Sequence, residues 1–435
     1  MFARSSGLLL HLTSLPGGRL GPAADEFLRF LEAAGQRWWQ VLPVGPAGYA
    51  GSPYAAHSAM AGDETLLPRE LAPLSEERLR AFRREQRAWL PDYALYRALK
   101  DRYGQRAWWT WPRGYRLRDP AALKRARVEL APRIRDHEVA QCQFADEWGA
   151  FKRRAHDAGV RLIGDVPLFV ARDSADVWAR PALFRLDVAA GVPPDYFSAD
   201  GQLWGNPHYA WDAHRRSRFS WWVARFRQEF ERFDALRIDH FLGLYRVWEV
   251  GRRARTARNG RWSPVPGDAL LNAVRKALGP RPLIAENLGI VTQGAEALRT
   301  SMDIPGMAVL HFAFGADPAA RPFWMARDTV VYTGTHDNDT TRGWQQGSPA
   351  DAARAQRYLG CTARALPQEM LRLAWNSPAD LAIAPAQDLL ALGTKARMNI
   401  PGTKDGNWRW RLRRGQLTAD HAARLRRLTA ESARA

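Results

Sequence analysis

The chain has 435 residues, of which 46% are hydrophobic and 25% are charged, a composition typical of a globular protein with a large core. No apolar run approaches the roughly 20 residues that a membrane-spanning helix needs, so no membrane partner is predicted. The two cysteines, Cys142 and Cys361, lie far apart and match no metal-binding or redox spacing, which gives no indication of an oxidising compartment.

The formal net charge of +19 suggests nucleic acid or an anionic membrane surface as a partner. However, much of the excess is arginine on predicted helices such as 76–87 and 422–427, and no recognisable nucleic-acid module accompanies it. A solvated, arginine-rich surface is therefore favoured over nucleic-acid binding. The 19 tryptophans should lie mostly in the core, although flat aromatic side chains beside a cleft also suit sugar rings.

Strand-like runs alternate with helical patterns along the chain. The first run is too short for a signal peptide, so it is interpreted as a strand, and a cytoplasmic location is expected. The predicted strands are 7–12, 38–44, 161–166, 236–239, 283–286, 308–314, 329–333 and 381–384. Helical patterns cover 24–34, much of 67–159, 220–233, 268–279, 293–302 and 419–428. Eight strands alternating with helices predict an α/β fold, a (β/α)8 TIM barrel.

The longer connections define the expected domain organisation. We predict a single catalytic barrel over residues 1–435, in which helical and loop segments are inserted between strands. A mainly helical insertion is expected at 62–140, after the second strand. An insertion at 171–212, after the third strand, is rich in Pro, Gly and aromatic residues, and is predicted to be an active-site loop.

Four carboxylates lie at or just past the C-terminal ends of predicted strands: Asp165, Asp239, Glu286 and Asp337. In a parallel barrel these ends meet at one mouth, where active sites are found. Because a carboxylate is costly to bury unless it is paired, several together indicate a function. The loop holding Asp337 also contains His336 and many small polar residues.

Two of these acids have different neighbours in the sequence. Arg237 and Asp239 are two residues apart on a strand and share a face, so the arginine should keep the aspartate ionised and suited to act as a nucleophile. A structural ion pair is the alternative interpretation. Glu286 follows an apolar run and has no basic neighbour in sequence, which makes it the better candidate acid. One ionised and one protonated carboxyl group facing each other are the groups that glycoside cleavage requires.

The signatures of other chemistries are absent from the sequence. There is no GxGxxG after a strand, no P-loop, no HExxH and no GxSxG. His11 and His311 fall on predicted strands and are interpreted as buried core groups in preference to ligands. Since the site chemistry needs only carboxylates, we expect neither a cofactor nor a metal.

Nine stretches, in order from residue 4 to about 408, carry a resemblance to a known family. They are RSSGLLLHLTSLPG, GQRWWQVLPVGP, SPYAAHSAMAG, LIGDVPLFVARDSADVW, AGVPPDYFSADGQLWGNP, LRIDHFLG, AENLG, YTGTHDNDTTRGW and ARMNIPGTKDGNW. The chain resembles the amylomaltases, which are 4-alpha-glucanotransferases (disproportionating enzymes) of the α-amylase clan. Single motifs such as RIDH would be weak, but nine in sequence are specific.

The resemblance implies a retaining transfer through a covalent glucosyl-enzyme, with Asp239 as nucleophile, Glu286 as acid/base and Asp337 as a third acid that holds and distorts the sugar. It also implies contacts from Arg237 and His336 to the nucleophile or the sugar beside it, from Tyr54 and Asp165 in the same subsite, from Tyr196, Phe197 and Trp204 in a loop covering the acceptor side, and from Asn399 near the acceptor. The implied partners are α-1,4-glucan and maltooligosaccharide donors and acceptors, and glucose.

The sequence departs from the family pattern at positions away from the three acids. His11-Leu12 replaces a His-Pro pair, Gly62-Asp63-Glu64 stands where AGNP is usual, and His311 replaces a common glutamine. The chain is also short for the family, with the segments after Gly62 and before Ala190 trimmed. Two alternatives stay open: an α-1,4-glucan hydrolase using the same acids, and a non-catalytic barrel that binds glucan or nucleic acid.

Overall fold

The computed structural model describes residues 2–194, 199–289, 292–315 and 326–435. Its central element is an eight-stranded sheet in the order β11-β8-β3-β2-β1-β14-β13-β12, in which the seven neighbouring pairs are all parallel. The eight strands are β1 (Ser5–Leu9), β2 (Trp38–Gln40), β3 (Arg161–Val166), β8 (Ala235–Ile238), β11 (Leu283–Ala285), β12 (Gly306–Val309), β13 (Thr329–Tyr332) and β14 (Leu381–Pro385).

The two ends of this sheet meet, so the strands form a nearly closed barrel. The backbone N–H of Ala285 in β11 donates to the carbonyl of Pro305, just before β12, at 2.9 Å. The N–H of Met307 in β12 donates to the side-chain Oδ1 of Asn287, also at 2.9 Å. With helices between the strands, this arrangement confirms the predicted (β/α)8 barrel.

Two small sheets stand beside the barrel. The larger has the order β10-β9-β5-β6 and consists of β5 (Val188–Val192), β6 (Gln202–Leu203), β9 (Arg246–Gly251) and β10 (Gly260–Pro264). The smaller pairs β4 (Phe184–Arg185) with β7 (His208–Tyr209). All of their strand pairs are antiparallel, and they belong to the connections that follow β3 and β8.

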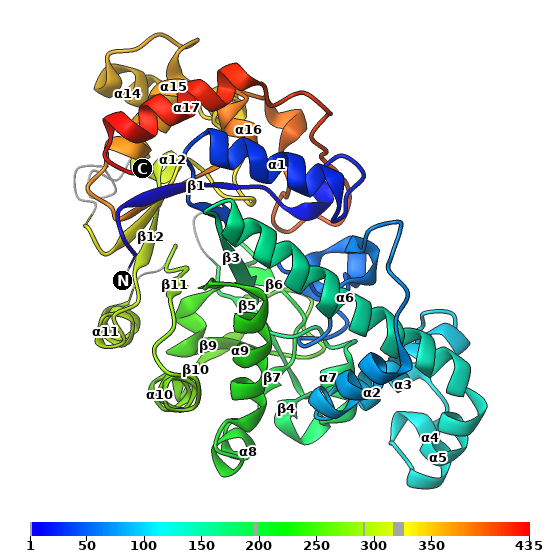
Figure 1. Ribbon diagram of the computed structural model, residues 1–435. Helices are drawn as coiled ribbons and strands as arrows, with labels where there is room; N and C mark the ends of the chain where they lie inside the picture. The colour runs from blue at the N-terminus through cyan, green and yellow to red at the C-terminus, as the bar shows by residue number, and fades with distance from the viewer. Residues whose placement is uncertain (1, 195–198, 290–291, 316–325) are drawn as a thin grey trace.

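Helices surround the barrel and extend to one side of it. The long α6 runs from the barrel toward the outlying helices α2 to α5 in Figure 1. The helices are α1 (Pro22–Ala33), α2 (Glu76–Glu85), α3 (Leu90–Arg102), α4 (Arg113–Arg116), α5 (Pro120–Glu129), α6 (Ala131–Asp157), α7 (Ala175–Ala179), α8 (Trp211–Arg216), α9 (Ser220–Arg232), α10 (Gly267–Leu278), α11 (Gln293–Ser301), α12 (Leu310–Ala313), α13 (Thr341–Gly347), α14 (Pro349–Leu359), α15 (Leu366–Asn376), α16 (Ala386–Leu389) and α17 (Ala419–Glu431). Among the described residues, none of these helices is both long and apolar enough to cross a bilayer.

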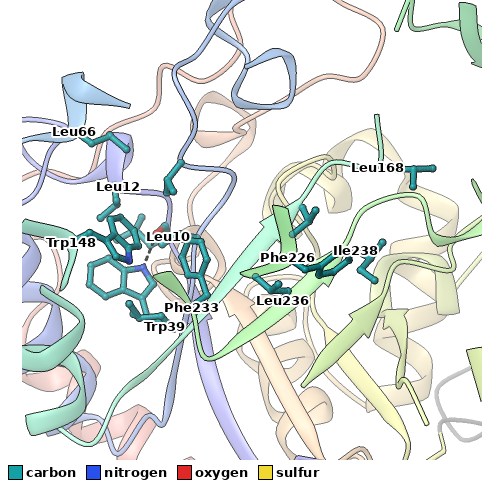
Figure 2. Close-up of a cluster of buried hydrophobic side chains, with 14 of the residues drawn as sticks. Leu10, Leu12, Trp39, Leu66, Trp148, Leu168, Phe226, Phe233, Leu236 and Ile238 are labelled. Atoms are coloured by element: carbon teal, nitrogen blue, oxygen red, sulfur yellow. Dashed lines mark hydrogen bonds between the residues drawn. The ribbon is translucent and has the colours of Figure 1, made fainter. Parts of the chain in front are cut away.

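The core has an inner and an outer part because successive strand residues point to opposite faces. Inside the barrel lie residues such as Ile163, Ala235, Ile284 and Tyr332. The outer cluster packs the strands against the helices, and Figure 2 shows part of it, including Trp39, Trp148, Phe233 and Leu236. The indole of Trp39 donates to the carbonyl of Leu10 at 2.7 Å, so this buried polar atom is satisfied.

Three strand predictions need correction. The first strand, predicted at 7–12, spans Ser5–Leu9, and Leu12 begins a short 3-10 helix. The second strand ends at Gln40 rather than at residue 44, and the following VLPV segment (41–44) forms part of the connection. The sixth strand, predicted at 308–314, ends at Val309, and α12 follows it directly. An apolar run of this kind suits a buried strand and a buried helical turn equally well, and its periodicity cannot separate them.

The two histidines predicted to be core groups are buried, although neither lies on a strand. His311 lies on α12, where its ring stacks on Trp344 with centroids 4.9 Å apart. His11 follows β1, and its Nδ1 accepts a hydrogen bond from the backbone N–H of Leu42 at 3.2 Å. Burial lowers the pKa of each ring to about 3, so both are neutral at ordinary pH.

Candidate active site

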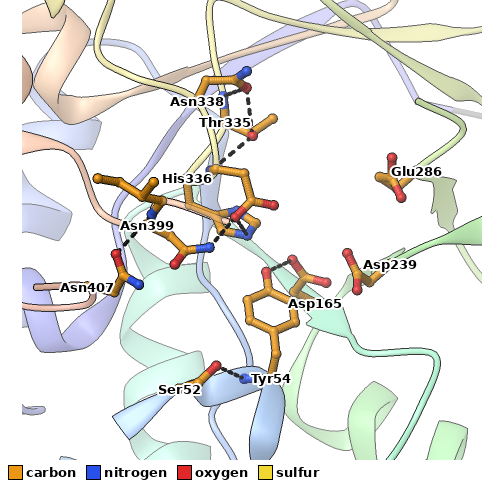
Figure 3. A network of polar contacts seen from close by, with 12 residues as sticks. Ser52, Tyr54, Asp165, Asp239, Glu286, Thr335, His336, Asn338, Asn399 and Asn407 are labelled. Atoms are coloured by element: carbon orange, nitrogen blue, oxygen red, sulfur yellow. Dashed lines mark hydrogen bonds and ion pairs between the residues drawn. The ribbon is translucent and has the colours of Figure 1, made fainter. Parts of the chain in front are cut away.

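The four predicted carboxylates lie at the C-terminal end of the barrel. Asp165 is in the last part of β3, Asp239 and Glu286 directly follow β8 and β11, and Asp337 lies in the loop after β13. Figure 3 shows Asp165, Asp239 and Glu286 along one side of a shared space, with His336 and Asn399 on another. Two walls of this site can be distinguished by the way their side chains are held.

The strand wall consists of Asp165, Arg237, Asp239 and Glu286. Nη1 of Arg237 lies 2.9 and 2.8 Å from the two carboxylate oxygens of Asp165 and 3.0 Å from Oδ1 of Asp239. The side chains of Arg237 and Asp165 are 4% and 0% exposed, whereas that of Asp239 is 28% exposed. The arginine thus holds both aspartates, and Asp239 is the one accessible from the cleft.

Tyr54 completes this buried group, because its hydroxyl donates to Oδ2 of Asp165 at 2.8 Å. Burial opposes the charge of Arg237, but Asp165 and Asp239 together raise its pKa well above the ordinary value. Burial also raises the pKa of Asp165, an effect that Arg237 opposes. For Tyr54, burial and then the charge of Asp165 raise the pKa, so the phenol keeps its proton and remains a donor.

Glu286 is held differently, by backbone groups. Its Oε2 accepts the N–H of His240 at 2.8 Å, and its Oε1 accepts the N–H of Leu288 at 3.0 Å. Burial raises the pKa of Glu286 to about 7, with Arg237 opposing the shift and Asp239 adding to it. Glu286 can therefore exchange a proton near neutral pH, whereas Asp239 lies against an arginine.

The loop wall consists of His336, Asp337, Arg397 and Asn399. Oδ1 of Asp337 accepts a hydrogen bond from Nδ2 of Asn399 at 2.6 Å and lies 3.4 Å from Nε2 of His336. Arg397 donates to the carbonyl oxygens of Asp337 and Asn399 at 2.6 and 2.7 Å, so it ties the two loops together. The Asp337 side chain is 42% exposed. Asn399, implied by the resemblance to lie near the acceptor, therefore contacts the third acid directly.

Aromatic rings line the space between the walls. Tyr54 stacks on His336 with centroids 5.2 Å apart and planes 14° apart, and Trp408 lies 5.9 and 6.1 Å from these two rings. Trp204, 38% exposed, meets the ring of His240 edge-on at 4.8 Å. The other two aromatic residues predicted for this loop, Tyr196 and Phe197, lie outside the described residues.

Hollows adjoin both walls. One is lined by residues that include His11, His336 and Arg397. The other is lined by residues that include Tyr54 and Asp165. Within the described ranges, no group of three or more His, Cys, Asp or Glu side chains is arranged to hold a metal ion. That no cofactor or metal is needed stays a prediction.

Three residues of the site were not singled out in the sequence: His240, Arg397 and Trp408. Each belongs to a stretch that carries the resemblance, since His240 follows Asp239 in RIDH and the other two lie in ARMNIPGTKDGNW. The sequence therefore offered a way to find all three, because they lie in the same motifs as residues that had already been chosen. What the sequence lacked was a reason to connect Arg397 with the loop of Asp337, because the two lie 60 residues apart.

Comparison with known proteins agrees with this geometry. The family model described as 4-alpha-glucanotransferase matches residues 10–79 and 69–418. The chain belongs to the 4-alpha-glucanotransferase family. It is 44% identical to the 4-alpha-glucanotransferase of Thermus thermophilus, over 97% of both chains, and 40% identical to that of Synechocystis sp., over 95% of both.

A solved structure shows the same fold. The amylomaltase of Streptococcus agalactiae, in complex with acarbose, matches with a TM-score of 0.94 and 34% identity over 99% of both chains. The resemblance stated from sequence motifs is confirmed, and so are the barrel fold, the enzyme class and the 4-alpha-glucanotransferase function that it implied. The roles of individual residues remain to be argued from their geometry.

Proposed function

We propose that this enzyme transfers an α-1,4-glucan segment to the 4-hydroxyl of an acceptor sugar by double displacement with retention, using Asp239, Glu286 and Asp337. The observation that carries the proposal is the contrast within the strand wall. Arg237 lies 3.0 Å from Asp239, which keeps that carboxylate available as a nucleophile, while burial raises the pKa of Glu286 to about 7. One group can attack while the other still holds a proton to donate.

The first displacement breaks the glycosidic bond. The Glu286 carboxyl gives its proton to the glycosidic oxygen as a carboxylate oxygen of Asp239 forms a bond to the anomeric carbon, and the shortened glucan leaves as an alcohol. In the second displacement, the Glu286 carboxylate removes the proton of the acceptor 4-hydroxyl. That oxygen then attacks the anomeric carbon and releases the Asp239 carboxylate. Atoms and charge balance over the cycle.

The loop wall supports the donor sugar in this scheme. Asp337 is accessible from the cleft and is oriented by Asn399, so it can accept hydrogen bonds from sugar hydroxyls next to the scissile bond. The stacked pair of Tyr54 and His336, with Trp408 beside it, offers flat apolar surface for a pyranose ring. Arg237, Asp165 and Tyr54 keep the floor of the same subsite rigid.

The aromatic loop at 193–207, which includes Tyr196, Phe197 and Trp204, is proposed to cover the acceptor side and exclude water from the covalent intermediate. Trp204 supports this because it is partly exposed and contacts the residue directly after the nucleophile. Trp204→Ala should raise the ratio of hydrolysis to transfer. If the ratio does not change, Trp204 has no part in excluding water.

The proposal keeps the domain organisation expected from the sequence. The chain is treated as one catalytic barrel over 1–435, with inserted segments at 62–140 and 171–212 that shape the rim of the cleft. Maltooligosaccharides, glucan and glucose are the proposed donors and acceptors. A cytoplasmic location and the absence of nucleic-acid binding stay predictions. Salt-dependent retention of the protein on DNA at physiological ionic strength would contradict the latter.

Incubation with maltotriose alone tests the proposed function. A ladder of longer maltooligosaccharides together with glucose is expected, and Asp239→Asn should abolish it. Glucose and maltose without longer products would indicate an α-1,4-glucan hydrolase that uses the same acids. No reaction, combined with retention on immobilised glucan, would indicate a non-catalytic binding barrel.

A further inference from the structure

The turn after β8 has an unusual backbone conformation. His240, between the nucleophile Asp239 and the short helix Phe241–Leu244, has φ 53° and ψ 56°, in the left-handed region. A residue with a side chain pays about 1–2 kcal/mol for this conformation. Such conformations persist only where the surrounding structure imposes them, and they cluster at functional sites.

Two neighbours hold the His240 ring in place. The Trp204 ring meets it edge-on, with centroids 4.8 Å apart. The ring also lies close to Gly243, where an added Cβ would come within 2.9 Å of Cδ2 of His240 and 2.1 Å of Cδ2 of Leu168. The ring therefore contacts Trp204 and also occupies space beside Gly243, a position that has no room for a side chain.

The backbone of the same turn holds the acid/base. The N–H of His240 donates to Oε2 of Glu286 at 2.8 Å, and the N–H of Phe241 donates to the carbonyl of Glu286 at 2.9 Å. The left-handed conformation matters for both bonds, because φ at residue 240 sets the direction of its N–H relative to its own side chain, and ψ sets the direction of the N–H of Phe241. The ring itself stays neutral at ordinary pH, since burial lowers the pKa of His240 to about 4.

We propose that His240 is a positioning residue that links the aromatic loop to the acid/base: its ring, packed against Trp204 and beside Gly243, fixes the turn that directs its N–H to the Glu286 carboxyl. This inference rests on the proposed function only for the role of Glu286. A hydrogen bond to a carboxylate favours the ionised form. While Trp204 is packed on His240, Glu286 is therefore biased toward the base that the second displacement needs. Moving Trp204 away loosens the turn and strengthens the affinity of Glu286 for its proton.

The experiment measures the pKa of Glu286 without turnover, by infrared titration of the protonated carboxyl band against Glu286→Gln. His240→Ala removes the ring and introduces alanine, which disfavours the left-handed region. The turn should then relax and lose the N–H bond to Glu286, so the pKa of Glu286 should rise by about one unit. His240→Asn should leave it nearly unchanged, because asparagine tolerates this conformation without a supporting ring. Trp204→Ala should raise it in the native background and have no effect in the His240→Asn background.

The charged groups acting on Glu286 are Arg237 and Asp239, from β8 and the turn after it, and none of these variants changes them. Circular dichroism and thermal unfolding identify any variant that is misfolded, and His240→Asn is the variant expected to fold normally. An unchanged pKa in Trp204→Ala, or an equal shift in both backgrounds, would overturn the link. Because the titration needs no substrate, failure of the maltotriose reaction would leave this result interpretable.

Discussion

The two walls of the cleft are built by different means. In the strand wall, Arg237 and Asp165 are almost fully buried, and they lie on adjacent strands whose register places Asp165 beside Arg237. In the loop wall, Asp337 is 42% exposed and is held by groups from a loop about 60 residues further along the chain. The first wall is part of the barrel, whereas the second is formed by loops that lie on top of it.

This difference separates stability from catalysis. A buried ion pair that loses one partner leaves an uncompensated charge in the core, which destabilises the fold. A half-exposed carboxylate that loses a hydrogen bond can still be solvated, so the fold should tolerate the change. Variants of the strand wall should therefore affect both folding and activity, and variants of the loop wall mainly activity.

The largest effect should come from Glu286→Gln, which keeps the shape but cannot donate a proton. With maltooligosaccharide donors, kcat should fall about 10²–10⁴-fold. With glucosyl fluoride as donor, the first displacement should be nearly normal, because fluoride leaves without general acid assistance. The measurement is single-turnover formation of the covalent intermediate with each donor. Equal losses with both donors would assign Glu286 to the structure of the strand wall and not to proton transfer.

The next effect is on stability. Arg237→Met leaves Asp165 buried without its cationic partner and should reduce the free energy of unfolding by about 3–5 kcal/mol, measured by urea denaturation. The double variant Arg237→Met/Asp165→Leu should recover much of this stability, because two apolar side chains replace the pair, yet remain inactive. A single variant as stable as the native protein would show that the ion pair is not integral to the barrel.

The strand wall could be predicted largely from local sequence. The i, i+2 spacing of Arg237 and Asp239 and the apolar run before Glu286 were enough to predict the contact between the first two and the raised pKa of the third, and the structure shows both. The catalytic roles drawn from them stay predictions. The period-two geometry of a strand carries this information across neighbouring residues. The contact of Arg237 with Asp165, by contrast, required the pairing of β3 with β8.

In the loop wall, Asp337 could be chosen from its place after a predicted strand, whereas Asn399 could be chosen only through the family resemblance. No periodicity relates Asp337 to Asn399, and loops can meet in many ways over the same barrel. Local sequence also failed to give the conformation of His240, since positive φ is uncommon for any residue other than glycine, even for histidine. The sixth strand was predicted too long for a different reason: an apolar run does not distinguish a strand from the buried helical turn α12.

A smaller effect is expected in the loop wall. Asn399→Ala removes the 2.6 Å hydrogen bond to Asp337, and kcat for maltotriose disproportionation should fall about tenfold, as expected for a lost bond to a charged group. The free energy of unfolding should change by less than about 1 kcal/mol. Thr403→Ala is the matched control in the same loop: the Thr403 hydroxyl donates to the carbonyl of Ile400 and accepts from Nδ2 of Asn407, and neither bond involves Asp337, so kcat should stay unchanged. A large loss of stability in Asn399→Ala would mean that the loops support the barrel.

The smallest expected effect is the absence of a shift, and it tests whether the walls are electrostatically separate. Because burial raises the pKa of Glu286 to about 7 and this group must be protonated to donate, kcat/KM should fall as pH rises above about 7, by about tenfold per pH unit. In Asn399→Ala this limb should keep its position while the plateau drops, since the lost bond involves Asp337 and not the groups that set the pKa of Glu286. In His240→Ala the fall of kcat/KM should move to higher pH, because the pKa of Glu286 is expected to rise. A limb that moved in Asn399→Ala would instead show that Asp337 and Glu286 titrate as one system across the cleft, and the two walls would then have to be treated as a single charged network.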